Sequence, residues 1–153
     1  MSVLTVLKPN MSERLVEVCP MLVRRLSEAA VKDWHRLRSH ILMDAGELGS
    51  RHMTVTWLEV PAGASQELHS HEEAEQVYVV AVGTGTLTVA GDTERLEPGD
   101  LAMVPPATDH TVANEGGTEL ALVSVQSPAV SVEETFGRQT AEVAGYDEDE
   151  DDY

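Results

Sequence analysis

Short runs of apolar and β-branched residues, separated by Gly, Pro and Asp, follow one another from Arg36 to Gln126. This spacing is typical of antiparallel sandwiches and barrels that are built from hairpins. Trp57, Met103, Val112 and Leu122 are expected to pack in the sheets or to line a cavity. We therefore predict an all-β fold with strands at Leu37–Met43, His52–Val60, Gln66–His71, Gln76–Val82, Gly85–Ala90, Thr93–Leu96, Leu101–Val104, His110–Asn114 and Leu120–Gln126.

The two ends of the chain lack this pattern. Ser12–Val18 and Ser27–Trp34 each begin with a helix-capping residue that has a Glu close behind it, which predicts one or two short helical turns. We expect residues 1–35 to be a partly helical N-terminal extension and residues 36–128 to be the β domain. Residues 129–145 are expected to pack on that domain or to be mobile.

The charge of the chain is strongly negative. Its 153 residues carry 10 Lys and Arg against 27 Asp and Glu, a formal net charge of −17. Nucleic acid is not expected as a partner, because binding a polyanion requires a basic surface. Asp147–Asp152 are six consecutive acids, which predict a disordered tail over residues 146–153. The acidic surface resembles that of proteins from salt-accumulating organisms, and a generic acidic bacterial protein is the alternative.

The cysteine content and the apolar runs restrict the class of protein further. Cys19 is the single cysteine, which excludes an internal disulfide and a cysteine-cluster zinc site, and no histidine is placed beside it by a motif. No apolar run approaches the roughly 20 residues of a membrane span, and residues 1–20 mix charges among their apolar positions. We expect a cytoplasmic protein without a membrane partner.

Three histidines are candidates for metal binding. His69 and His71 lie two apart in a predicted strand, so both imidazoles should point to one face, and His110 begins another predicted strand. Imidazole nitrogen suits Fe, Mn, Zn and Ni. A His-x-His pair alone is weak evidence, since such pairs are often hydrogen-bonded surface residues. His35, His40 and His52 are expected to be ordinary surface or core histidines.

The glycines, prolines and histidines around this pair form two motifs of known spacing. The first motif places Gly63, His69, His71 and Gly83 in order, and the second places Gly99, Pro105, His110 and Asn114. In these residues the chain resembles the cupin superfamily, in its small single-domain microbial type. The resemblance implies an antiparallel jelly-roll β-barrel with one divalent transition metal inside, Fe, Mn, Zn or Ni, and commonly a homodimer. Ala107 stands where the second motif has Gly, which suggests that the turn tolerates a Cβ atom.

The acidic ligand position of the first motif is occupied by Glu75 and Gln76. Gln76 keeps six residues before Gly83, whereas Glu75 would require a bulge, and the two side chains should point to opposite faces. We favour Gln76 and keep Glu75 as the alternative. The resemblance then implies His69, His71, Gln76 and His110 as metal ligands, similar to the three-His-plus-Gln sites of some cupins of uronate and sugar-acid metabolism.

This ligand set has consequences for function. Neutral ligands leave the full charge on a divalent ion, which favours a small anionic partner that bears a carboxylate. Tyr78 shares the parity of Gln76 and Glu67 that of His69, so both are candidate catalytic residues for proton transfer. The alternatives place Tyr78 in packing at the barrel mouth and Glu67 on the exposed rim. We expect a metal-dependent isomerase, lyase or dioxygenase; a non-catalytic metal- or metabolite-binding or accessory cupin is the alternative.

Overall fold

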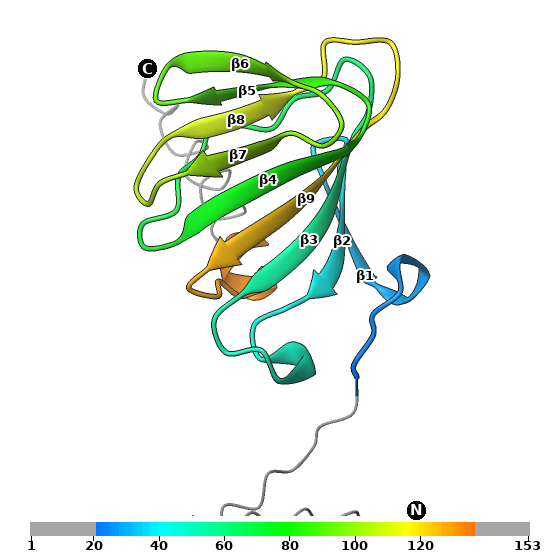
Figure 1. Cartoon of the computed structure of the whole chain (residues 1–153), viewed down its shortest axis with the longest axis vertical. Coiled ribbons are helices and arrows are strands. Elements are labelled where there is room, and N and C mark those ends of the chain that lie inside the picture. The colour runs from blue at the N-terminus through cyan, green and yellow to red at the C-terminus, as the bar shows by residue number, and fades with distance from the viewer. Residues whose placement is uncertain (1–20, 137–153) are drawn as a thin grey trace, which may run out of the picture.

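The computed structural model describes residues 21–136, so the predictions for Ser12–Val18, Cys19 and the acidic tail lie outside the described residues. Two antiparallel sheets make up this part of the chain (Figure 1). In spatial order, the larger sheet contains β1 (Ala30–Trp34), β2 (Leu37–Met43), β3 (Thr54–Val60), β9 (Leu120–Ser127), β4 (Glu75–Val82) and β7 (Leu101–Val104). The smaller sheet contains β6 (Asp92–Leu96), β5 (Gly85–Val89) and β8 (His110–Ala113).

Short helical turns accompany the strands. They are η1 (Leu26–Glu28), η2 (Glu47–Gly49) and a helical turn at residues 132–136. None of the helical turns between residues 21 and 136 is long and apolar enough to cross a membrane. The predicted all-β fold with a short, partly helical N-terminal segment is therefore confirmed for the described part of the chain.

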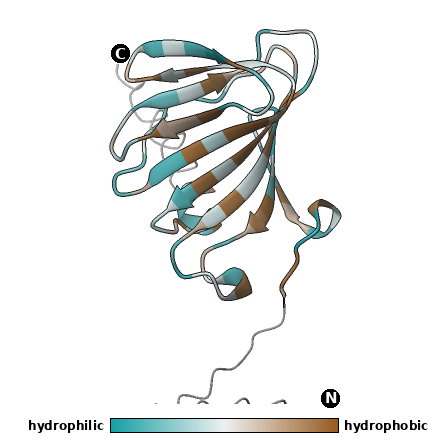
Figure 2. Cartoon of the chain, in the orientation of Figure 1, coloured by the Kyte–Doolittle hydropathy of each residue, from teal (hydrophilic) through white to brown (hydrophobic). Residues whose placement is uncertain are grey.

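The inner faces of the two sheets form the core. Alternate residues of β4 and β9 point inward, and Val80 of β4 lies opposite Leu122 of β9. Figure 2 shows the resulting alternation of hydropathy along these strands. Leu87 of β5 and Val112 of β8 cover the core from the smaller sheet. Burying side chains of this size is the main stabilising contribution to such a fold.

The outer face of the larger sheet is also apolar in its centre. Two rows of cross-strand neighbours run over β3, β9, β4 and β7. The sequence predicts that Met103 packs in the sheet or lines a cavity; it lies in this outer face opposite Val77 and is 45% exposed, because β7 is an edge strand that turns Val104 inward. The rows are Val55–Val125–Val77–Met103 and Trp57–Val123–Val79–Leu101.

Two predicted elements differ from the structure. The stretch predicted to be helical, Ser27–Trp34, is mostly β1, which pairs with β2 through a turn at His35 and Arg36. Both turn residues have positive φ, 45° and 72°, a conformation typical of two-residue hairpins but normally signalled by Asn or Gly. The predicted strand Gln66–His71 is an extended segment that makes isolated bridges with β8.

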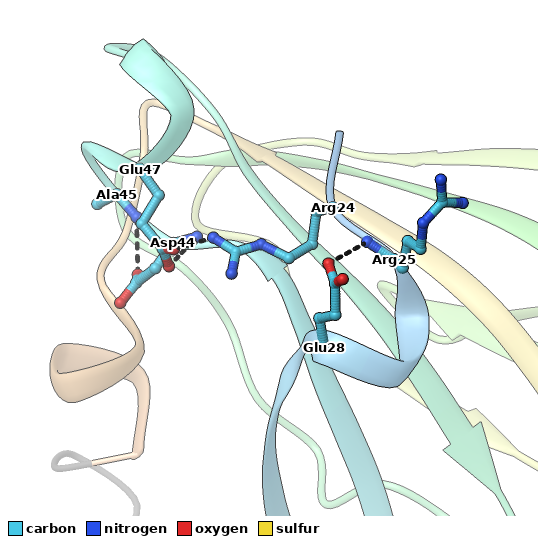
Figure 3. Close-up of polar contacts among 6 residues, drawn as sticks. All are labelled: Arg24, Arg25, Glu28, Asp44, Ala45 and Glu47. Atoms are coloured by element: carbon cyan, nitrogen blue, oxygen red, sulfur yellow. Dashed lines mark hydrogen bonds and ion pairs between the residues drawn. The ribbon is translucent and has the colours of Figure 1, made fainter. Parts of the chain in front are cut away.

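A polar network joins three segments at one end of the larger sheet (Figure 3). The Arg24 guanidinium donates to the Glu47 carboxylate at 2.5 Å, and the Asp44 amide donates to the same side chain at 3.1 Å. Asp44 Oδ1 accepts hydrogen bonds from the amides of Ala45 and Val132, at 2.7 and 3.0 Å. The network ties the segment after β9 to the loop between β2 and β3.

Candidate metal centre

Three histidine side chains meet between the two sheets. His69 and His110 exchange backbone hydrogen bonds of 3.1 and 2.9 Å, and the His71 carbonyl accepts one of 2.6 Å from the Ala107 amide. The centroid of the His69 ring lies 4.2 Å from the centroid of the His110 ring and 5.1 Å from that of the His71 ring. One ligand nitrogen from each of the three rings lies within 4.8 Å of the others. Small side-chain rotations bring such a cluster around one ion.

Backbone carbonyls orient two of the rings. His69 Nδ1 donates to the Glu67 carbonyl at 2.8 Å, and His110 Nδ1 donates to the Thr108 carbonyl at 2.9 Å. A proton on Nδ1 leaves the lone pair on Nε2 of a neutral imidazole. Metal-binding histidines are usually held in this way by a hydrogen bond from the other ring nitrogen. The donor set therefore fits a divalent transition metal.

Gln76 lies beside this cluster. Its side chain is 3% exposed, its Nε2 donates to Ser124 Oγ at 2.7 Å, and its Oε1 lies 2.9 Å from His110 Nε2. In this amide orientation two lone-pair atoms face each other, an arrangement that a shared cation stabilises. Glu75 is exposed and points to the opposite face of β4. The structure thus brings Gln76, and not Glu75, to His110 and into the cavity that His69 and His71 line.

Burial favours the neutral form of two of the imidazoles, those of His69 and His110. Removal from solvent, followed in size by the nearby charge of His69, lowers the pKa of His110 from 6.5 to about 4. Burial also lowers the pKa of His69, against the opposing effect of its hydrogen bond to the Glu67 carbonyl. Neutral rings are the form that binds a metal.

This lowering predicts a pH effect on the stability of the metal-free protein. Between about pH 6.5 and pH 4 the unfolded chain binds more protons at His110 than the folded chain, so the free energy of unfolding falls as the pH falls. We expect denaturant titrations at about pH 7.5 and pH 4.5 to show a larger loss for the metal-free wild type than for His110→Asn, which lacks the titrating ring. Equal losses in the two proteins would contradict this prediction.

The cluster opens into a cavity of about 90 Å³. His69, His71 and Gln76 line its inner end, and His110, which is fully buried, lies directly behind Gln76. From there the cavity follows the inner face of the larger sheet, and residues after β9 also line it, Phe136 among them. Two of the histidines and Gln76 thus lie in the wall of a cavity that could take a small molecule.

The two candidate catalytic residues lie in different environments. Tyr78 is fully buried in the cavity wall, its hydroxyl donates to Gln66 Oε1 at 3.5 Å, and burial raises its pKa. Glu67 is exposed, its carboxylate lies 3.3 Å from His35 Nε2, and it does not line the cavity. Its contribution to the site is the backbone carbonyl that orients His69.

Several polar residues of the cavity were missed by sequence reasoning. Ser124 and Gln126 of β9 lie on the same, inward side of the strand as Leu122. Strand alternation would have identified them if the pairing of β9 with β4 had been known. Thr54 and Thr56 of β3 follow by the same rule. Strand pairing is not visible in the sequence, and these residues belong to no motif.

The comparisons with known proteins point to one family. A family model for the cupin domain matches residues 56–126. An uncharacterised protein of Methanocaldococcus jannaschii is 32% identical over 76 residues, which are 50% of this chain and 61% of that protein. An oxalate-binding protein of Thermotoga maritima is 28% identical over 68 residues, which are 44% of this chain and 56% of that protein. The matches thus span less than two thirds of these relatives.

Solved structures share the fold. A predicted oxalate decarboxylase from Thermotoga maritima has a TM-score of 0.65 at 21% identity, over 70% of this chain and 99% of the other. KdgF from Halomonas sp. has a TM-score of 0.63 at 20% identity, over 71% of this chain and 96% of the other. A Cupin 2 conserved barrel domain protein from Salinispora arenicola has a TM-score of 0.61 at 21% identity, over 80% and 99%. At these identities the likeness concerns the fold.

Proposed function

Because the chain belongs to the cupin superfamily, we propose that it binds one divalent transition metal, Fe, Mn, Zn or Ni, through His69, His71, Gln76 and His110. The proposal rests on one observation, the buried amide oxygen of Gln76 at 2.9 Å from Nε2 of His110, in the cluster that His110 forms with His69 and His71. A divalent ion with only neutral ligands keeps its full charge and acts as a strong Lewis acid toward oxygen ligands. Such a site favours small molecules that bear a carboxylate.

The chain's own residues support chemistry on such a ligand, of isomerase, lyase or dioxygenase type. Tyr78 lines the cavity, and its raised pKa keeps the hydroxyl protonated near neutral pH, so it acts as a hydrogen-bond donor to a ligand oxygen. The hydroxyl has one proton, which it donates to Gln66 Oε1 at 3.5 Å, so donation to a ligand oxygen would replace this long hydrogen bond. Glu67, as an exposed residue outside the cavity lining, remains a predicted general base without a contact that supports the role.

A binding function without turnover is the second candidate. It is favoured by the similarity to the oxalate-binding protein of Thermotoga maritima. Oxalate is a small dianion that offers two oxygens to one ion, as the proposed site requires. Binding and catalysis share the same first step here, which is metal-dependent capture of a carboxylate.

This capture is tested by calorimetry with pyruvate and with hydroxyacetone, its neutral analogue. We expect the metal-loaded protein to bind pyruvate more tightly than hydroxyacetone, and the metal-free protein to bind neither. Gln76→Glu should retain the metal and weaken pyruvate binding by about tenfold or more, because the new carboxylate cancels one positive charge. Tighter binding of hydroxyacetone, or unchanged pyruvate binding in the metal-free protein, would refute the proposal.

We further propose that the chain forms a homodimer through the outer apolar face of β3, β9, β4 and β7. The two rows of this face contain no charged side chain, whereas the whole chain carries −17, so two copies can approach there with the least electrostatic repulsion. Leu101 is 62% exposed in this face. A large apolar surface of this kind is typical of contacts between copies.

Light scattering after size exclusion tests the assembly. We expect a dimer for the wild-type chain and a monomer for Leu101→Asp, because a charge within the contact would be buried without a partner. Leu68→Asp is the matched control, since Leu68 is 64% exposed and lies outside the face. A monomeric wild-type protein, or dissociation by both variants alike, would contradict this interface.

A further inference from the structure

The polarity of the cavity changes in one direction across the larger sheet. One cross-strand row runs from Tyr78 of β4 through Ser124 of β9 and Thr56 of β3 to Ile41 of β2. All four side chains line the cavity. The row therefore begins with hydroxyl groups next to the histidines and ends on an aliphatic side chain far from them.

The distal end of the cavity is mainly apolar. On the inward side of β2 it is lined by Leu37, Ile41 and Met43, with one polar side chain, Ser39, among them. Val132 and Phe136, from the segment that Asp44 ties down, line the same cavity together with Thr135. This end therefore offers a ligand mainly apolar contacts and two hydroxyl groups, and no charge.

The length of the cavity follows from the sheet. Neighbouring strands lie about 4.8 Å apart, and three such spacings separate β4 from β2, so the row spans about 14 Å. The cavity has a volume of about 90 Å³. A chain laid along this row would leave the hydroxyl groups beside the head group and end against Ile41.

No charged residue lines the cavity among the residues that the structure describes. A ligand that carries a second negative charge would have to bury it at the apolar end without a partner, which costs several kcal/mol. The single positive group in reach of an anion is the metal that the histidines would hold. A second carboxylate or a phosphate at the far end is therefore disfavoured.

We propose that the ligand is an elongated monocarboxylate: a 2-oxo or 2-hydroxy acid head group at the histidines, followed by an unbranched aliphatic chain that reaches Ile41 and Met43. This inference rests on the proposed function, because the head group requires the metal. It goes beyond it by naming the chain and by disfavouring uronates and those dicarboxylates whose second charge would reach the apolar end; oxalate, with both carboxylates at the metal, is not affected.

The test compares two ligand series on the metal-loaded full chain by calorimetry. The first series is pyruvate, 2-oxohexanoate, 2-oxooctanoate and 2-oxodecanoate, the last of which is long enough to span most of the row, and the second is 2-oxooctanedioate and 2-oxodecanedioate. We expect the affinity in the first series to rise by about fourfold for each added CH₂ that is buried. The dicarboxylates should bind more weakly than the monocarboxylate with the same number of carbon atoms.

A variant that introduces a charge makes the assignment specific. Met43→Lys places a cation at the apolar end, where Met43 is half-buried and lines the cavity. We expect this variant to bind 2-oxodecanedioate more tightly and 2-oxodecanoate more weakly than the wild type. Met53→Lys is the matched control, because Met53 is 45% exposed and does not line the cavity; it should leave both affinities unchanged.

The outcomes separate this inference from the proposed function. Flat affinities in the first series, or dicarboxylates that bind as tightly as monocarboxylates, would overturn the aliphatic assignment while leaving metal-dependent capture intact. Equal effects of Met43→Lys and Met53→Lys would overturn the placement of the chain on β2. Metal-loaded protein that binds no member of either series would refute the proposed function itself. Metal content and thermal melts are measured for each variant, so that a folding defect is recognised.

Discussion

Replacing His71 and His110 together by Ala is expected to abolish stoichiometric metal binding. Two of the four proposed ligands are removed, one from the extended segment before β4 and one from β8, so the remaining His69 and Gln76 cannot enclose an ion. Elemental analysis of protein purified without a histidine tag measures the metal content. A double variant that retains one metal per chain would refute the site.

Matched controls distinguish loss of ligands from loss of fold. His35 and His52 are exposed, so their double replacement by Ala removes two imidazoles and should leave the metal content unchanged. Gln76→Ala should weaken metal binding, whereas Glu75→Ala should not, because Glu75 is exposed on the opposite face of β4. A sharp loss in Glu75→Ala with none in Gln76→Ala would move the ligand assignment to Glu75.

The fold could be predicted largely because the strand signals are local. The β2 strand has the predicted bounds, and β4 to β9 begin and end within about two residues of the predicted runs, since alternation and turn residues both act within a few positions. The β1 strand could not be predicted in this way. Its burial is low, and its pairing with β2 depends on positive φ at His35 and Arg36, residues that carry no turn signal.

The residues of the candidate site could be predicted where a sequence motif fixes the spacing between them. They could not be predicted where they meet only because two strands pair. The three histidines do meet, although His69 and His71 lie in an extended segment held by isolated bridges and not in a regular strand. Ser124, by contrast, reaches Gln76 only because β9 inserts between β3 and β4, 48 residues away along the chain. A contact between segments so far apart in the chain produces no hydrophobic pattern in the sequence of either segment.

Ala107 shows how a departure from a motif is accommodated. Its φ of 54° is left-handed, the conformation for which glycine is the usual residue, and its amide donates to the His71 carbonyl. The expectation that the turn tolerates a Cβ atom agrees with this geometry. The backbone contact to His71 is kept at some conformational cost.

The last prediction concerns Gly83, the glycine that ends the first motif. A Cβ atom at this position would lie 2.2 Å from the Glu119 carbonyl oxygen, and its φ of 75° is left-handed as well. We expect Gly83→Ala to lower the free energy of unfolding by about 3 kcal/mol or more, the left-handed φ contributing about 1–2 kcal/mol of it. Denaturant unfolding of the metal-free protein measures the loss.

Gly91→Ala isolates the steric part of this effect. Gly91 has a φ of 86°, and a Cβ atom there would meet nothing within 4 Å, so this variant should lose only the conformational contribution of about 1–2 kcal/mol. The additional loss of unfolding free energy in Gly83→Ala then measures how closely the chain after β4 approaches Glu119, the residue before β9. Because β4 carries Gln76 and β9 carries Ser124, that approach helps to set the register in which the two side chains meet. Equal losses in the two variants would show that the motif requires this glycine for its φ alone.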